Sequence, residues 1–187
     1  MSEVNYSQKQ SKLNPPSEGE MYIMDYLEDM GIKYIREVEI NNLREDSAKF
    51  RRADFYLPKY KVYVEFQGRW NNSKEDRVRY SNKKVVFYKN SIPCIYIYPE
   101  NLGILEFSFI KRMVLLLKEH SMTSQLRRFR WLMFSEEEGD TNVFMLLSAV
   151  ILILFNYNGD ASWLNIGIFL LVYHVYQIQS KFRKVVY

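Results

Sequence analysis

Two long stretches in the final third of this sequence are almost free of charge, which separates them from everything before them. Residues 142–159 contain no charged side chain, and residues 161–180 contain none apart from a charge that His174 can carry. A helix needs about 20 mostly apolar residues, with a range of about 17 to 25, to cross the hydrocarbon core of a bilayer. Each stretch meets that minimum, so the sequence predicts two transmembrane helices with a tight turn around Asp160.

The flanks of these stretches predict the orientation of the hairpin. Aromatic residues that suit the membrane interface lie near the ends of the stretches: Tyr157, Trp163, Tyr173 and Tyr176. Basic residues lie before the first stretch and after the second: Arg127, Arg128, Arg130, Lys181, Arg183 and Lys184. Because positive residues stay on the cytoplasmic side, we expect a membrane protein with two spans and both termini in the cytoplasm. The alternative is a pair of buried helices in a soluble core.

Residues 17–120 have the pattern of an α/β domain. Helical spacing of apolar residues predicts helices over 17–30 and 102–120, and the stretch 73–90, which is rich in Arg and Lys with a weaker apolar period, indicates an exposed helix. Alternation and short apolar runs predict strands over 32–40, 50–57, 61–67 and 92–98. The predicted remainder is a flexible leader over 1–16, a juxtamembrane linker over 121–141, the membrane hairpin over 142–180 and a basic cytoplasmic tail over 181–187.

Composition limits which functions the chain can have. The net charge is only +4, from 26 basic and 22 acidic residues, so any contact with nucleic acid must be local. A single cysteine, Cys94, excludes an intramolecular disulfide and a cysteine-based zinc site. The aromatic-rich hairpin offers a face for a homo-oligomer, although no strong small-residue motif supports one.

Two acidic residues lie on strands that a short turn joins. Asp54 belongs to one strand and Glu65 to the next, with the turn at residues 58–60. Adjacent strands let two carboxylates converge on a hard cation such as Mg²⁺, which prefers oxygen ligands. Alternation puts Glu65 and Gln67 on one face, while Phe66 points into the core. We therefore expect Glu65 and Gln67 to point at the same site.

At these residues the sequence resembles the PD-(D/E)xK nuclease superfamily, especially its small members related to very-short-patch-repair and homing endonucleases. The resemblance covers residues 17–120 and rests on the order and spacing of four parts. These are Ser17-Glu18-Gly19-Glu20 at a helix start, the strand from Arg52 to Pro58, the strand end Val64-Glu65-Phe66-Gln67-Gly68, and the strand over 92–98 after a basic helix. The resemblance implies a restriction-endonuclease-like mixed sheet flanked by helices.

The resemblance also implies a catalytic site. Asp54 and Glu65 would hold Mg²⁺ or Mn²⁺, with the Phe66 carbonyl as a further ligand, and Glu20 would reach the same site or orient a water. The metal would polarise the phosphate and activate water for hydrolysis of DNA phosphodiester bonds. Gln67 would complete the catalytic set.

Gln67 departs from the family pattern, which usually has a lysine there to position water and neutralise charge in the transition state. Three interpretations follow from this departure. In the first, Gln67 suffices through its hydrogen bonds; in the second, a basic residue of the next helix such as Lys83 or Lys84 replaces the missing charge; in the third, the site is inactive.

Other residues have a structural interpretation beside the functional one. The basic residues of the following helix and its approach are expected to contact phosphates, with Trp70 and Tyr80 able to stack: Arg69, Arg77, Arg79, Lys83 and Lys84. They could equally form a solvated helix face. Glu20 could complete a capping box with Ser17, and Asp54 could form a surface ion pair with Arg51 or Arg52.

The sequence as a whole predicts a membrane-anchored, metal-dependent nuclease that hydrolyses DNA. The alternative is a catalytically inactive, membrane-tethered module that binds nucleic acid or another partner.

Overall fold

The structure is a computed structural model that describes residues 14–135, 150–151, 168–173 and 175–176. The chain divides into two compact units, one ending at Leu116 and the other beginning at Leu117. The tail, most of the leader and most of the hairpin predicted over 142–180 lie outside the described residues. In the described part of the chain, no helix combines the length and apolarity needed to cross a membrane.

A four-stranded sheet forms the centre of the first unit. Its strands lie in the order β1 (Ile35–Asn41), β2 (Phe50–Leu57), β3 (Val62–Phe66) and β4 (Cys94–Ile97). The first three strands pair antiparallel, and β3 and β4 pair parallel. The expected α/β fold with a mixed sheet is therefore confirmed.

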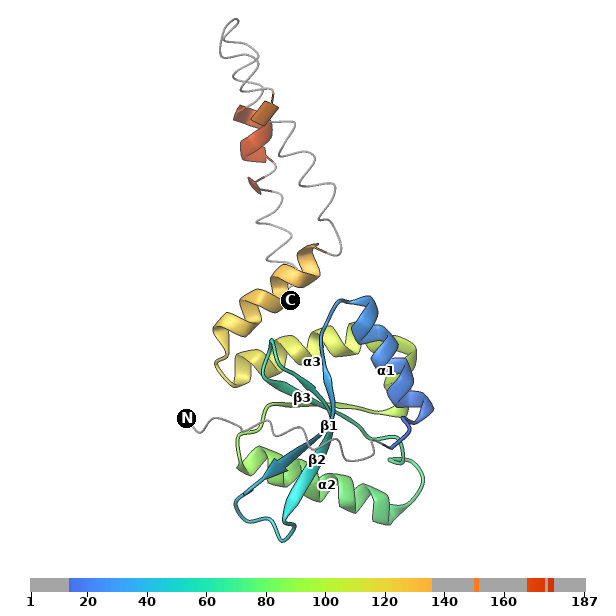
Figure 1. The fold of residues 1–187 in the computed structure, drawn as a ribbon. Helices are drawn as coiled ribbons and strands as arrows, with labels where there is room; N and C mark the ends of the chain where they lie inside the picture. Colours follow the sequence, from blue (N-terminus) through green and yellow to red (C-terminus); the bar gives the residue numbers. More distant parts are fainter. Residues whose placement is uncertain (1–13, 136–149, 152–167, 174, 177–187) are drawn as a thin grey trace, which may run out of the picture. The chain divides into compact units, whose positions relative to one another are not determined.

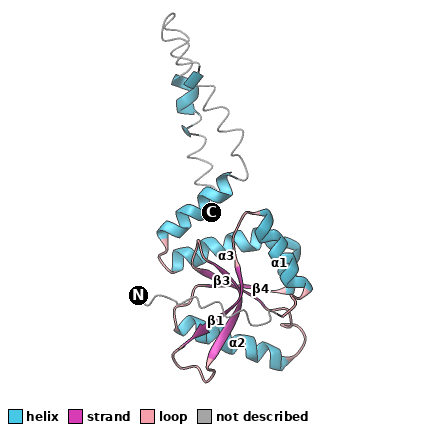
Figure 2. Cartoon of the chain, in the orientation of Figure 1, coloured by secondary structure: helices cyan, strands magenta, loops and turns pink. Residues whose placement is uncertain are grey.

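Helices cover both faces of this sheet. They are α1 (Glu18–Asp29), α2 (Lys74–Lys89) and α3 (Leu105–Glu119), with the short 3-10 helix η1 (Pro99–Ile104) before α3. In Figure 1, α2 lies on one face of the sheet, and α1 and α3 lie on the other. Figure 2 shows the same arrangement by element type. Since parallel strands need a crossover connection, α2 has to pass over the sheet between β3 and β4.

The first strand begins later than predicted because α1 ends in an ordered cap. Gly31 has φ +60°, and its N–H donates to the Glu28 carbonyl at 2.9 Å. The N–H of Ile32 donates to the Leu27 carbonyl at 2.8 Å, which completes a Schellman motif. Ile32 therefore belongs to the helix cap, and β1 begins at Ile35.

The same bonding ends α2. Ser91 has φ +53°, and its N–H donates to the Tyr88 carbonyl at 3.0 Å. The Ile92 N–H donates to the Phe87 carbonyl at 3.0 Å. The strand predicted from residue 92 therefore begins at Cys94.

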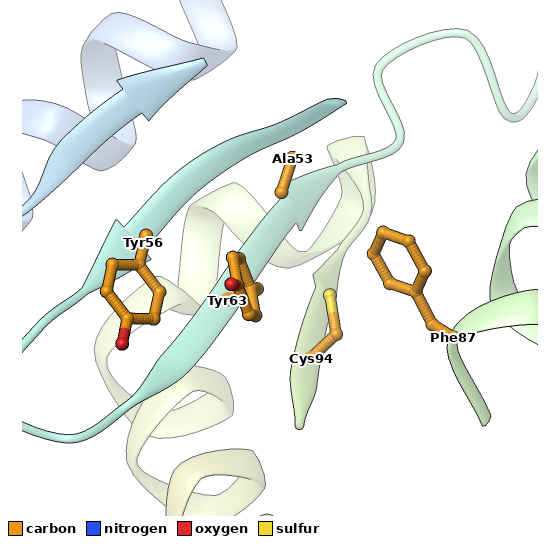
Figure 3. Close-up of a cluster of buried hydrophobic side chains, with 5 residues drawn as sticks. All are labelled: Ala53, Tyr56, Tyr63, Phe87 and Cys94. Atoms are coloured by element: carbon orange, nitrogen blue, oxygen red, sulfur yellow. The ribbon is translucent and has the colours of Figure 1, made fainter. Parts of the chain in front are cut away.

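Hydrophobic side chains hold α2 against the sheet. Phe87 of α2 is fully buried in a cluster with residues from three strands (Figure 3): Ala53, Tyr56, Tyr63 and Cys94. Tyr56 and Tyr63 are cross-strand partners whose ring centroids lie 4.7 Å apart. Burying a side chain such as Phe contributes about 1.5–3 kcal/mol, so Phe87 helps to fix the position of α2 over the sheet.

Residues 123–135, which the sequence assigned to the linker over 121–141, are helical. Leu126, Phe129 and Met133 are buried and recur at helical spacing. This segment is therefore an amphipathic helix, and the juxtamembrane position of residues 121–141 stays a prediction.

The start of α1 approaches the end of β3 closely. A Cβ atom added at Gly19 would lie well inside van der Waals contact of the Phe66 ring. The absence of a side chain at Gly19 therefore lets α1 reach the sheet here, which brings the following Glu20 toward the same strand end. Gly103 offers a contrast, because a Cβ atom there would meet nothing within 4 Å.

We expect Gly19→Ala to lower the free energy of unfolding by about 1–3 kcal/mol, because the added methyl group displaces the Phe66 ring. Urea unfolding followed by tryptophan fluorescence measures the change. Gly103→Ala is the matched control, and it should leave stability unchanged or raise it by up to about 1 kcal/mol. Equal effects of the two substitutions would contradict the close approach of α1 to Phe66.

Candidate functional site

A pocket of about 400 Å³ opens where β2 and β3 meet the helices of the first unit. Strand β2 contributes Phe50, Arg51, Arg52 and Asp54 to its lining, and β3 contributes Glu65 and Phe66. The helices complete the lining with Glu20 from α1 and with Arg79, Tyr80 and Lys83 from α2. The pocket therefore combines three carboxylates with four basic side chains.

Asp54 and Glu65 lie together in this pocket, as the hairpin predicted. Strands β2 and β3 pair with Phe55 opposite Val64, and Asp54 and Glu65 are the residues that follow this pair on the two strands. The Phe66 N–H donates to Asp54 Oδ2 at 2.6 Å, which fixes the Asp54 carboxylate at the end of β3. The carboxylates of Asp54 and Glu65, from adjacent strands, thus both line the pocket.

Lys83 reaches the acidic part of the pocket from α2. Its Nζ donates to Glu65 Oε1 and, at 2.5 Å, to the Arg52 carbonyl. The side chain of Lys83 is 16% exposed and that of Glu65 only 4%, so this ion pair is largely shielded from water. Lys84, the other candidate from the sequence, is exposed and lies over the Tyr96 ring at 5.1 Å. Lys83 is therefore the lysine of α2 that reaches the carboxylates.

Burial raises the pKa of both carboxylates, and the charge of Glu65 adds to this effect at Asp54. Burial, and then the neighbouring Glu65 charge, raise the pKa of Asp54 to about 8, while Lys83 and the Phe66 N–H oppose the shift. Burial also raises the pKa of Glu65, again against the effect of Lys83. The pocket therefore takes up protons more readily than exposed carboxylates do.

The donor set fits a hard divalent cation. Glu65 Oε2 is buried and has no hydrogen-bond partner among the described residues, so it can accept a metal ion in addition to Lys83 at Oε1. The described part of the chain contains no group of three or more His, Cys, Asp or Glu side chains placed to hold a metal. Mg²⁺ suits such a site, because it commonly takes one or two carboxylates and keeps several waters.

Glu20 forms the capping box that the sequence allowed, and it also lines the pocket, while its predicted role toward a metal or water stays a prediction. The Ser17 N–H donates to Glu20 Oε2 at 2.7 Å, and the Glu20 N–H donates to Ser17 Oγ at 3.4 Å, which makes the capping box of α1. The same residue lines the pocket, and its charge contributes to the raised pKa of Asp54. Glu20 is held by its helix cap at the edge of the site.

Gln67 does not line the pocket, so its role in the site stays a prediction. Its side chain is buried, Oε1 has no hydrogen-bond partner among the described residues, and Gln67 is not among the residues that line the pocket. Strand β3 ends at Phe66, but the Gln67 N–H still donates to the Ile97 carbonyl at 2.8 Å, which continues the pairing with β4. Phe66 itself lines the pocket, with its ring against Gly19.

The arginines before Asp54 do not pair with it, so the surface ion pair considered from the sequence is wrong. Arg51 donates through Nε and Nη2 to the two oxygens of Asp46, both at 2.7 Å. Arg52 contacts Glu37 and Glu39. Both arginines line the pocket, and the sequence analysis missed them as site residues. Arg52 was open to prediction, because it precedes Asp54 by two residues and so shares its face of the strand.

The predicted nucleic-acid contacts divide into two groups. Arg79 and Lys83 line the pocket, whereas three residues are exposed and lie outside its lining: Arg69, Arg77 and Lys84. The Arg79 guanidinium lies 4.9 Å from the centre of the Tyr80 ring, and Tyr80 lies beside Trp70 with ring centroids 6.4 Å apart. Basic and aromatic groups therefore continue from the pocket along the start of α2.

Comparison with known proteins gives no match to a family model, to a curated protein or to a solved structure. The function proposed for the site therefore rests on its own residues.

We expect Asp54→Asn to flatten the pH dependence of stability when a chelator is present. The pKa of Asp54 is about 8 in the folded chain, against about 4 when unfolded. The folded chain therefore binds more protons between these values, and the free energy of unfolding falls as pH rises, by up to about 1.4 kcal/mol per pH unit.

Because Asp54→Asn removes this titration, the variant should gain stability relative to the wild type as pH rises, and match it most closely near about pH 4. Thermal unfolding across this range measures the difference. Parallel pH profiles for the two chains would contradict the raised pKa of Asp54.

Proposed function

We propose that this chain is a metal-dependent nuclease of the PD-(D/E)xK type, which hydrolyses DNA phosphodiester bonds. The observation that supports this most is the contact of Lys83 with Glu65 beside Asp54. This contact restores an Asp, Glu and Lys set that Gln67 breaks in the sequence. The basic lining of the pocket provides the attraction that a phosphate backbone needs.

In this proposal the three carboxylates of the pocket, Phe66 and Lys83 have the following roles. Asp54 and Glu65 hold Mg²⁺ or Mn²⁺, with the Phe66 carbonyl as a further ligand. When bound, the metal polarises the phosphate and lowers the pKa of a water molecule. Lys83 orients that water and neutralises charge that develops on the phosphate, which is the role usually filled by lysine at the position of Gln67. Glu20 orients water at the edge of the pocket.

A second candidate is a binding module without catalysis. Lys83 already neutralises Glu65 inside the pocket, and Gln67 lies outside its lining. A cation must therefore compete with an internal ammonium group for Glu65. If Lys83 stays bound to Glu65 and excludes the cation, the pocket and its arginines bind nucleic acid without cutting it.

We also propose that the hairpin over 142–180 tethers this domain to a membrane, with both termini in the cytoplasm. This proposal is supported by the two stretches that carry almost no charge, residues 142–159 and 161–180. The preceding helix over 123–135 is consistent with a nearby membrane surface, because it exposes Arg127, Arg128 and Trp131, the last by 63%. Such a tether would confine cleavage to nucleic acid near the membrane.

We expect the detergent-solubilised chain to cut linear, supercoiled or single-stranded DNA with Mg²⁺ or Mn²⁺ and not with a chelator. Three substitutions should each lower the rate by at least about 100-fold, because each removes a charge from the reacting centre: Asp54→Asn, Glu65→Gln and Lys83→Met.

Lys84→Met is the matched control for the lysine, since Lys84 is exposed on the same helix and lies outside the lining of the pocket. It should cut as the wild type does. Failure of the folded wild type to cut any of these substrates or RNA, with metal present, would refute the nuclease. Metal-independent binding in that case would support the binding module.

The membrane tether predicts that the chain stays in the membrane pellet through high-salt and alkaline washes and is released by detergent. A variant that ends after residue 135 should pass to the supernatant, because it lacks both apolar stretches. Release of the full chain by the washes alone would contradict a spanning hairpin.

A further inference from the structure

The backbone of β1 has an uncommon conformation at the point where it passes Asp54. Strands β1 and β2 pair through Arg36 with Phe55 and through Val38 with Ala53, but Glu37 and Asp54 between them are not paired. Glu37 has φ +49°, in the left-handed region that residues with a Cβ atom rarely adopt. Such conformations persist where the surrounding structure holds them, often at functional sites.

The Glu37 side chain contributes to a clamp around a pocket arginine. Arg52 Nη1 lies 3.5 Å from Glu37 Oε2, and Arg52 Nη2 lies 3.2 Å from Glu39 Oε1. Arg52 precedes Asp54 by two residues on β2, so the two side chains share a face of the sheet. The Arg52 carbonyl accepts the hydrogen bond from Lys83 Nζ. Side chain and backbone of Arg52 are thus both part of the pocket network.

Arg52 differs from the other two arginines of the pocket in how firmly it is engaged. Arg51 makes two short bonds to one carboxylate, and Arg79 pairs with Asp76 at 3.0 Å while lying over Tyr80. Both contacts of Arg52, at 3.5 and 3.2 Å, are longer than these and use two of the five N–H donors of a guanidinium. Arg52 is therefore oriented while keeping donors for another anion.

We infer that Arg52 binds the non-bridging oxygens of the phosphate that is cut, and that Glu37 and Glu39 hold its guanidinium in position for this. The planar guanidinium fork matches two phosphate oxygens, which makes arginine suited to the role. The two glutamates orient the fork and also offset its charge. This inference rests on the proposed function, since it names how that site holds its substrate.

The first test measures binding of the full chain to a fluorescent single-stranded oligonucleotide by anisotropy, with a chelator and over a series of salt concentrations. Arg52→Gln should weaken binding roughly tenfold and reduce the slope of log affinity against log salt by about 0.7, the value for one phosphate contact. Arg44→Gln is the matched control, because Arg44 is exposed, lies outside the pocket lining and is not among the predicted phosphate contacts, and it should change affinity by less than about twofold.

The second test separates positioning from charge. Glu37→Gln removes a negative charge near the pocket, so oligonucleotide binding should stay equal or become tighter. Cleavage should nevertheless slow by about tenfold in kcat with little change in KM, because the guanidinium loses its orientation. Arg52→Lys, which keeps the charge and loses the fork, should also bind well and cut slowly. Circular dichroism checks that each variant folds.

The outcomes are distinguishable from a failure of the proposed function. If the wild type neither binds nor cuts any nucleic acid, the proposed function is wrong. If the wild type binds and cuts but Arg52→Gln binds equally well, the role of Arg52 alone is overturned. If Glu37→Gln speeds cleavage along with tighter binding, the glutamates only offset charge and the positioning role is wrong.

Discussion

The buried Glu65 carboxylate is the group on which the rest of this site depends. It lies on β3, between β2 and β4, and only 3% of the residue is exposed. A buried charge without a partner costs several kcal/mol, so this position requires a compensating group in the folded chain. Lys83 provides that group, and its place requires α2 to pass over this face of the sheet. The ion pair between Lys83 and Glu65 therefore stabilises the fold and also forms part of the candidate site.

The topology of the sheet meets this demand through a single connection. Because β3 and β4 are parallel, the chain needs a crossover between them, and α2 is that crossover. Phe87, one helical turn after Lys83, anchors α2 in the cluster with Tyr56 and Tyr63. The hydrophobic contact of Phe87 thus sets the rotation of α2 about its axis. Because Lys83 lies one turn earlier on the same side of α2, it reaches Glu65.

Local patterns predicted the elements well, whereas contacts between elements were harder to predict. Capping at Ser17 and alternation around Asp54 are properties of neighbouring residues, so α1 and β2 followed from the sequence. The choice between Lys83 and Lys84 depends on how α2 packs, which the sequence left open. The left-handed Glu37 lies in a regular alternation that gives no sign of it.

The central claim is that Asp54 and Glu65 bind one divalent cation in competition with Lys83 and with protons. Isothermal titration of Mn²⁺ into the chain, in buffers of different ionisation enthalpy, tests it most directly. The account predicts a single site that releases about one proton or more at neutral pH, and that is lost in a double variant with Asp54→Asn and Glu65→Gln. Absence of binding to the wild type, or equal binding to the double variant, would contradict it.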